Sequence, residues 1–98
     1  MIIERKIEND RLTISPMGRL DSATGDEFKA AIDENLTGEI KTLVIDFGGV
    51  DFISSKALRV IVSVYKSLCD RKMEFVGANA SVKEVFRVSG LLKIFDVQ

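Results

Sequence analysis

Residues 42–47, Thr-Leu-Val-Ile-Asp-Phe, form a short apolar run rich in β-branched side chains near the middle of the chain. Such a run is typical of a central strand that is covered on both faces, as in a parallel or mixed sheet. The run ends at Gly48-Gly49, and a helical pattern begins soon afterwards, near Ser54-Ser55. We therefore expect this segment to lie at the centre of an α/β sheet.

The rest of the chain alternates between strand-like and helix-like patterns. Leu12 and Ile14 alternate with polar residues, as in a half-buried strand, and Pro16 indicates an edge or the end of that strand because it has no N–H to donate. The expected elements are, in chain order, strands over 2–7 and 11–17, a helix from about 21 to 36, the strand over 42–47, a helix from about 54 to 68, a strand over 73–77, a helix over 81–88 and a last apolar turn over 91–95. This order predicts one α/β domain, with a mixed sheet of about four or five strands and about three or four helices packed on it.

The predicted helices have recognisable starts and apolar faces. Asp21 or Ser22 can cap the first helix, and Ser81 with Glu84 makes a capping-box pattern at the start of the third. The apolar positions at helical spacing are Phe28, Ala31, Ile32 and Leu36 in the first helix and Ala57, Val60, Ile61, Val64 and Leu68 in the second. These positions are expected to face the sheet, and the basic residues of the second helix fall mostly outside them.

The composition excludes most kinds of enzyme chemistry. No histidine is present among 98 residues, which removes Ser-His-Asp and Cys-His nucleophile systems and imidazole zinc ligands. A single cysteine, Cys69, can form neither an internal disulfide nor a thiolate metal cluster. The 14 basic and 15 acidic residues give a formal charge of −1, without the basic surplus of a nucleic-acid-binding protein. We therefore expect no catalytic residues, no metal, no cofactor and no nucleic-acid partner.

The amino terminus and the apolar stretches bear on localisation. The first residues, Met-Ile-Ile-Glu-Arg-Lys, become charged after three positions, so no signal-peptide segment is expected. The apolar stretches are far shorter than the roughly 20 residues that a membrane-spanning helix needs. Together with the free cysteine, these features predict a cytoplasmic protein without membrane insertion.

Two hydroxyls, on Ser54 and Ser55, lie at the predicted start of the second helix. A helix start carries unpaired N–H groups and a partial positive charge, which favour an added phosphate. A serine there is also the ordinary cap of a helix, so the residues alone leave capping and phosphorylation open for each serine. Asp46, at the end of a strand, has two interpretations as well: it can bind a ligand in a crevice or stabilise the turn that follows.

Three segments of the chain resemble the STAS domain family. They are Gly-Arg-Leu-Asp-Ser-Ala-Thr at 18–24, Phe-Ile-Ser-Ser-Lys-Ala-Leu-Arg-Val-Ile at 52–61 with Asp46 ahead of it, and Val-Phe-Arg-Val-Ser-Gly-Leu-Leu-Lys-Ile-Phe at 85–95. They follow one another in the family's order along nearly the whole chain. More narrowly, they are similar to the bacterial anti-sigma factor antagonists. The resemblance implies a STAS-like (SpoIIAA-like) fold in a single STAS domain over residues 1–98.

The resemblance also implies a switch without catalysis of its own. An antagonist of this family binds an anti-sigma factor that is also a serine kinase, and so frees a sigma factor. The kinase phosphorylates a serine at the helix start, which ends the complex, and a Ser/Thr phosphatase resets the protein. Ser55 takes the position of the phosphoacceptor, Ser54 that of the preceding Asp, and Asp21 that of an acidic residue near the site. The contact edge would be residues 53–60, which include Lys56 and Arg59.

Three departures from the family pattern concern this same segment. Lys56 and Ala57 stand where a small residue and glycine are common, and a methyl group at 57 would intrude if the partner's backbone came close there. Ser54 in place of Asp removes one negative charge beside the acceptor. Lys56 and Arg59 could hold a phosphate on Ser55 or be ordinary solvated charges. The alternative function is a scaffold or accessory subunit of a transport or signalling complex, without phosphorylation.

Overall fold

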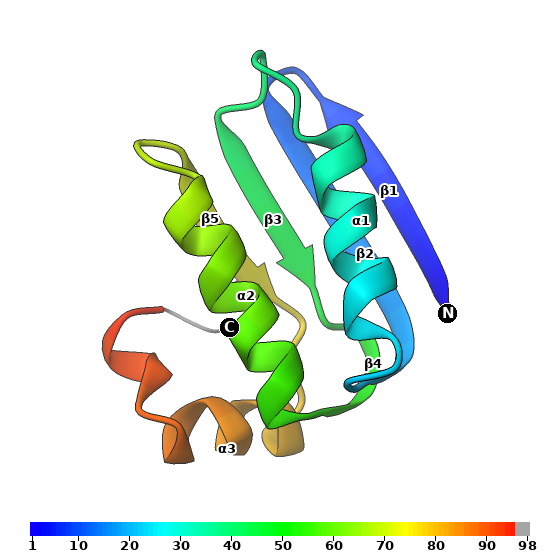
Figure 1. Cartoon of the computed structure of the whole chain (residues 1–98), viewed down its shortest axis with the longest axis vertical. Coiled ribbons are helices and arrows are strands. Elements are labelled where there is room, and N and C mark those ends of the chain that lie inside the picture. The colour runs from blue at the N-terminus through cyan, green and yellow to red at the C-terminus, as the bar shows by residue number, and fades with distance from the viewer. Residues whose placement is uncertain (96–98) are drawn as a thin grey trace.

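The computed structural model describes residues 1–95 of the 98-residue chain. Its elements, shown in Figure 1, are β1 (Ile2–Glu8), β2 (Arg11–Leu20), α1 (Gly25–Asn35), β3 (Thr42–Asp46), β4 (Gly49–Ile53), α2 (Ser55–Ser67), β5 (Lys72–Val76), α3 (Ala80–Val88) and the short 3-10 helix η1 (Leu91–Lys93). The predicted α/β class is confirmed, with a mixed sheet of five strands and three α-helices.

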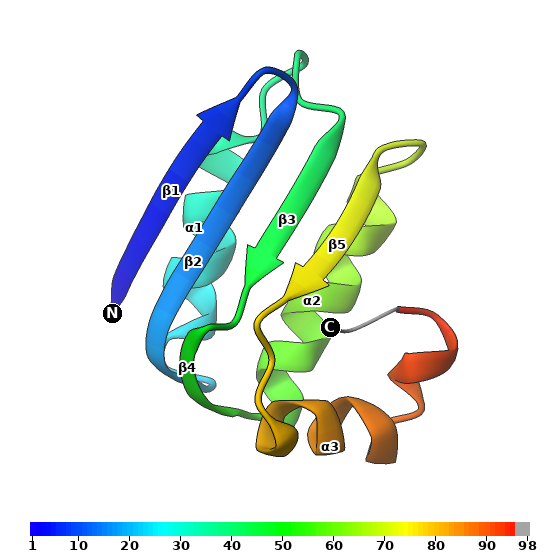
Figure 2. The ribbon, with the colours of Figure 1, turned by 180° about the vertical axis from the view of Figure 1, so that it is seen from behind.

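Strand β2 is the centre of the sheet. It pairs antiparallel with β1 on one side. On its other side it runs parallel first to β3, over Arg11–Ile14, and then to β4, over Met17–Leu20. Strand β5 continues the sheet beyond β3, again in parallel. Strands β3 and β4 thus succeed one another along the same side of β2 (Figure 2).

Two predictions for this part of the sheet were wrong. The predicted order of elements has no strand between residue 47 and the second helix, whereas Gly49–Ile53 forms β4. The strand predicted over 11–17 extends to Leu20, and Pro16 lies inside it rather than at its end or on an edge. Pro16 is tolerated there because it falls between the stretch of β2 that pairs with β3 and the stretch that pairs with β4.

Helices α1 and α2 cover one face of the sheet, and α3 lies at the end where β4 runs into α2 (Figure 1). The apolar stripe predicted for α2 is buried except at Val60, which is half-buried, and the stripe of α1 is buried except at the half-buried Leu36. The core between these layers is continuous, and its largest fully buried side chains are Phe28, Phe47, Phe75, Phe86, Leu12, Ile14, Leu20, Ile32, Leu43, Ile45, Ile53 and Ile61.

The central strand β3 is buried on both faces, as predicted, although helices cover only one of them. Viewed from behind, the described chain shows no helix over the sheet (Figure 2). Val44 is nevertheless only 5% exposed, although it does not belong to the core cluster. Its neighbours in register are Thr13 on β2 and Glu74 on β5. Flanking side chains therefore bury this face of β3 and account for the unbroken apolar run.

Two helix starts also differ from the prediction. Helix α1 begins at Gly25, after Thr24, because the carboxylate of Asp21 accepts from the N–H groups of Ala23 and Thr24 and closes a turn of its own. Helix α3 is capped by Asn79, whose Oδ1 accepts from the Val82 N–H at 2.8 Å, rather than by Ser81. The Asn79 amide also donates to the Val50 carbonyl of β4, a tertiary contact that no local pattern reveals.

Candidate functional site

The pairing of β2 with β4 assembles the candidate site. Leu20, at the end of β2, lies beside Ile53, at the end of β4. The N–H of Ser54 donates to the Leu20 carbonyl at 2.9 Å, so the two chain segments leave the sheet together. Asp21 follows β2 and Ser54 follows β4. The pairing of the two strands therefore explains why Asp21 lies near the start of α2, as the family resemblance implies.

The two serines at the start of α2 have different surroundings. Ser54 is the N-cap: its backbone is extended, its side chain is half-buried, and its Oγ accepts from the Ala57 N–H at 3.2 Å. Ser55 is the first residue of the helix and is exposed. Within residues 1–95, the cap is the only hydrogen bond that the Ser54 side chain forms, and the Ser55 hydroxyl forms no hydrogen bond. Ser54 therefore holds the helix start, and Ser55 offers its hydroxyl to solvent.

Asp21 is kept ionised by its own turn. The backbone N–H of Thr24 donates to its Oδ1 at 3.1 Å and that of Ala23 at 3.0 Å. These bonds, the Thr24 bond foremost, lower the pKa of Asp21 below its ordinary value, and Arg19, with its Nε 3.7 Å from Oδ2, acts in the same direction. The carboxylate therefore presents a fixed negative charge beside the start of α2.

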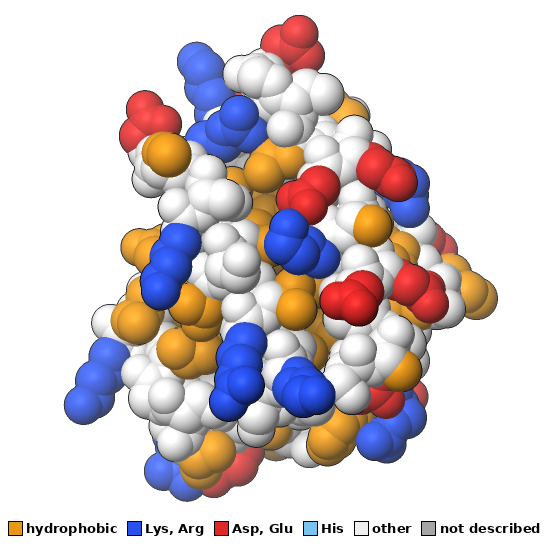
Figure 3. Space-filling view, viewed as in Figure 1, with side chains coloured by type: hydrophobic (Ala, Val, Ile, Leu, Met, Phe, Trp, Pro, Cys, Tyr) orange, Lys and Arg blue, Asp and Glu red, His pale blue; other side chains and the backbone are white. Residues whose placement is uncertain are grey.

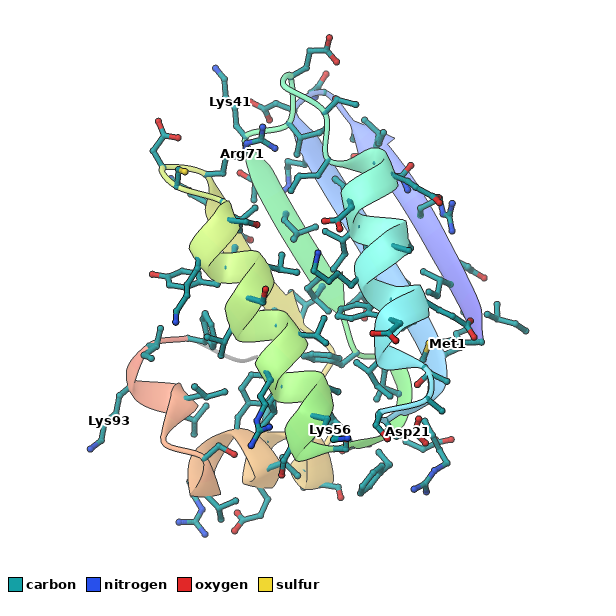
Figure 4. All side chains as sticks on the ribbon, in the orientation of Figure 1. Met1, Asp21, Lys41, Lys56, Arg71 and Lys93 are labelled. Carbon is teal, nitrogen blue, oxygen red and sulfur yellow. The ribbon has the colours of Figure 1, made fainter. Side chains whose placement is uncertain are left out.

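Two basic side chains of α2, Lys56 and Arg59, lie on the same side of the helix start as Asp21. Asp21 and Lys56 lie at the same end of the molecule in Figure 4. They line a hollow of about 320 Å³ to which Arg59 and the acidic Asp26 also contribute. Lys56 and Arg59 are exposed, and the first turn of α2 holds no acidic residue. The structure thus brings the predicted positions Asp21, Lys56 and Arg59 to one hollow at the end of the molecule where α2 begins with Ser54 and Ser55.

Ala57, which stands where glycine is common in the family, does not obstruct contacts on this surface. Ala57 is fully buried, so its methyl group points into the core rather than toward a partner. The interpretation of Asp46 is also decided by geometry, because its Oδ1 accepts from the Gly48 N–H at 2.8 Å. This bond stabilises the turn between β3 and β4, which was one of the two interpretations of Asp46.

Two features beside the site were missed in the sequence. The guanidinium of Arg19 lies 4.3 Å from the ring centroid of Phe52, which is 37% exposed. A groove of about 580 Å³ adjoins Ser55 on its other side, lined by Ser55, Leu58, Arg59, Val62, Ser63, Lys66, Ser89 and Leu91. The spacing of the α2 residues could have indicated one shared helix face. The Arg19–Phe52 contact and the far wall of the groove depend on pairings between distant segments.

Residues 1–95 contain no group of three or more His, Cys, Asp or Glu side chains arranged to hold a metal ion. Over the same residues, no helix combines the length and the apolar character needed to cross a membrane.

A family model described as STAS domain matches residues 3–98. The chain belongs to the STAS domain family. Among its relatives is BtrV of Bordetella bronchiseptica, whose name places it with the anti-sigma factor antagonists. BtrV is 35% identical over 82 residues, which are 82% of this chain and 71% of BtrV. The resemblance seen in the sequence is confirmed, and this STAS domain is related to the anti-sigma factor antagonists, which are regulators rather than enzymes.

Solved structures agree on the fold. An anti-sigma factor antagonist from Mycobacterium paratuberculosis superposes with a TM-score of 0.89, at 22% identity, over 98% of this chain and 83% of that one. SpoIIAA of Bacillus, in its unphosphorylated form, superposes with a TM-score of 0.81, at 18% identity, over 96% of this chain and 85% of that one. SpoIIAA has also been solved in a phosphorylated form, which matches with a TM-score of 0.74. The predicted SpoIIAA-like fold is thereby confirmed.

Proposed function

We propose that this STAS domain, spanning residues 1–98, is a cytoplasmic anti-sigma factor antagonist switched by phosphorylation of Ser55. In the unphosphorylated form it binds an anti-sigma factor that is also a serine kinase, and a sigma factor is released. The kinase then modifies Ser55 and the complex separates. A Ser/Thr phosphatase that acts on the phosphorylated form returns the protein to its binding state.

The observation that carries the proposal is the exposed hydroxyl of Ser55 at the first position of α2. A kinase can reach this hydroxyl without opening the fold, whereas Ser54 is occupied as the cap. The added phosphate would lie near the positive end of the helix dipole and beside Lys56, with Arg59 one turn further on. The existence of a phosphorylated form of the structurally similar SpoIIAA supports the same interpretation.

The electrostatic change is large for a chain of formal charge −1. A phosphate adds about −1.5 to −2 charges at neutral pH, all of it at one end of α2. Asp21, whose carboxylate is held ionised nearby, would reinforce the local negative field. Like-charge repulsion and desolvation at a contact with the kinase can then exceed about 1.4 kcal/mol, which is tenfold in affinity. Asp21, Ser54, Lys56 and Arg59 are the residues we assign to this contact.

The test uses the purified chain, ATP and an anti-sigma factor serine kinase of the same organism. Phosphopeptide mass spectrometry should locate a single phosphate on Ser55, and Ser55→Ala should abolish it. In a binding assay with the same kinase, Ser55→Ala should keep wild-type affinity and Ser55→Asp should bind more weakly. Ser54→Asp is a matched control, because it adds the same charge one residue earlier while leaving the acceptor in place.

Two results would contradict the proposal. A phosphate on another residue, or none, would remove Ser55 as the acceptor. Equal binding by Ser55→Ala and Ser55→Asp would show that the contact does not respond to charge at this position. That second result, together with transporter genes in the neighbourhood, would favour the alternative of a scaffold or accessory subunit.

A further inference from the structure

The groove beside Ser55 follows one face of α2. Its α2 residues are Ser55, Leu58, Arg59, Val62, Ser63 and Lys66, each of which has another member of the set three or four residues away, as on one face of a helix. Its other wall is Ser89 and Leu91, at the turn from α3 into η1. At about 1.5 Å rise per residue, the stripe from Ser55 to Lys66 is about 16 Å long, which is about three helical turns. The groove is therefore elongated rather than round.

The lining combines an apolar floor with a basic rim. Leu58 is almost fully buried, Val62 and Leu91 are half-buried, and Arg59 and Lys66 are exposed. Figure 3 shows Lys and Arg side chains beside an apolar patch on this face, whereas the acidic side chains gather over α1. The lining that the structure describes contains no acidic residue. An occupant of this groove should therefore be apolar along its centre and negatively charged at its edges.

The cations of the rim are available to such an occupant. Helix α2 carries Lys56, Arg59 and Lys66 and no acidic residue. The ion pairs within residues 1–95 involve neither Arg59 nor Lys66. Val88 and Leu92, which flank the lining residues of the second wall in the chain, are large apolar side chains with exposed fractions of 66% and 42%. Exposed apolar side chains thus lie next in sequence to the second wall, and exposed apolar surface of this kind is typical of a site for a macromolecule.

We infer that the groove between α2 and the Ser89–Leu91 turn is the docking site for an acidic amphipathic helix of about three turns in the partner protein. Its apolar face would cover Leu58, Val62 and Leu91, and its carboxylates would pair with Arg59 and Lys66. The inference rests on the proposed function, since it specifies the partner that Ser55 controls.

The same geometry gives the phosphate a second way to act. Ser55 and Arg59 are four residues apart on α2 and line the same groove. Side chains at this spacing are neighbours on a helix surface. A phosphate on Ser55 therefore competes with the carboxylates of the docked helix for Arg59, in addition to repelling them.

The test is a titration of the ¹⁵N-labelled full chain, followed by NMR, with a 14-residue helical probe peptide. The probe carries leucine along one face and glutamate on both flanks, and a control peptide carries lysine in place of each glutamate. Amide shifts should concentrate on the groove residues of α2 and on Ser89–Lys93, with the glutamate peptide only. Arg59→Glu and Lys66→Glu should each raise the dissociation constant about tenfold, as should phosphorylation of Ser55.

Lys41→Glu is the matched control, because it makes the same charge change at the opposite end of the molecule from Lys56 (Figure 4). It should alter the dissociation constant less than twofold. Shifts outside the groove, no shifts, equal binding of the lysine peptide, or shifts caused by raising the protein concentration alone would overturn the inference. The last result would assign the groove to a second copy of the chain.

The outcomes also separate the groove from the proposed switch. If the glutamate peptide binds the groove but the kinase leaves Ser55 unmodified, the docking inference stands and the proposed function fails. If Ser55 is phosphorylated and releases the kinase, yet Lys66→Glu changes neither kinase nor peptide binding, the groove is refuted and the proposed function stands.

Discussion

Replacing the two neighbouring serines one at a time should have opposite consequences for stability and for signalling. Ser54→Ala removes the Oγ that accepts from the Ala57 N–H at 3.2 Å. Ser55→Ala removes an exposed hydroxyl that forms no hydrogen bond within residues 1–95. The first change should therefore weaken the fold and leave the phosphoacceptor, whereas the second should leave the fold and remove the acceptor.

The magnitudes follow from the role of each side chain. Loss of an N-cap serine costs about 1 kcal/mol, within a range of about 0.5–2. Ser54 is half-buried, so water only partly replaces the lost bond to the Ala57 N–H. For Ser55→Ala we expect a change within about 0.5 kcal/mol, since an exposed position without partners rarely contributes more. For a domain of this size, about 1 kcal/mol corresponds to a fall in Tm of about 4–8 °C.

Urea titrations and thermal melts followed by circular dichroism measure both changes. Ser54→Asp is the control, because the carboxylate can still accept from the helix N–H groups and is favoured by the helix dipole, so it should melt at or above the wild-type temperature. The assignment of cap and acceptor would be refuted if Ser55→Ala were as destabilising as Ser54→Ala. It would be refuted equally if Ser54→Ala melted with the wild type.

Three further substitutions test the surroundings of the site. Asn79→Ala removes both the cap of α3 and the bond to β4, and should lower the free energy of unfolding by about 1–2 kcal/mol in a urea titration. Gly77→Ala should cost at least about 1 kcal/mol by the same measurement, because Gly77 has a φ of +74° and an added Cβ would lie 2.7 Å from Asp46 Oδ1. Asp21→Asn should flatten the acid limb of the stability curve. The pKa of Asp21 is lowered on folding, so its stabilisation is complete above the ordinary carboxyl pKa and is lost as the pH falls through the lower folded value. Parallel acid limbs for wild type and Asp21→Asn would contradict this account.

The features that depend on local pattern were predictable. The start of α2 at Ser54–Ser55 and the stripe from Ala57 to Leu68 follow from side chains three and four residues apart, and the structure agrees with both. The class of the sheet followed from the order of the elements in the same way. These properties depend on residues that are close in the sequence, so they can be recognised from one sequence alone.

The features that depend on register were not predictable from the residues. Pro16 was misplaced because a proline is compatible with the interior of β2 only where the partner strand changes. Strand β4 was missed because Gly49–Ile53 alternates poorly and is fixed by its pairing with β2. The caps of α1 and α3 were assigned wrongly for a related reason: Asp21 is used by its own turn, and Asn79 is held by β4.

The candidate site also has features that depend on local pattern and features that depend on contacts between distant segments. The hydroxyls at the start of α2 were visible as a local pattern, although that pattern could not separate cap from acceptor. The proximity of Asp21 to them came from the family resemblance, because it depends on Leu20 and Ile53 lying side by side. The groove has one wall on α2 and the other about thirty residues away at Ser89 and Leu91, and no periodicity connects the two.

The division of labour between Ser54 and Ser55 explains how the proposed switch could act without remodelling the fold. A ligand or a modification shifts binding only through a difference in interaction free energy between two states. If the modified serine were also the cap, phosphorylation would break the bond to the Ala57 N–H and alter the helix start. Because Ser54 keeps that bond and its N–H stays on the Leu20 carbonyl, the frame remains while charge is added one residue later. The whole effect of the phosphate would then fall on the surface that α2 presents, where the phosphate and the partner's carboxylates compete for Arg59. A tenfold change in affinity there needs only about 1.4 kcal/mol.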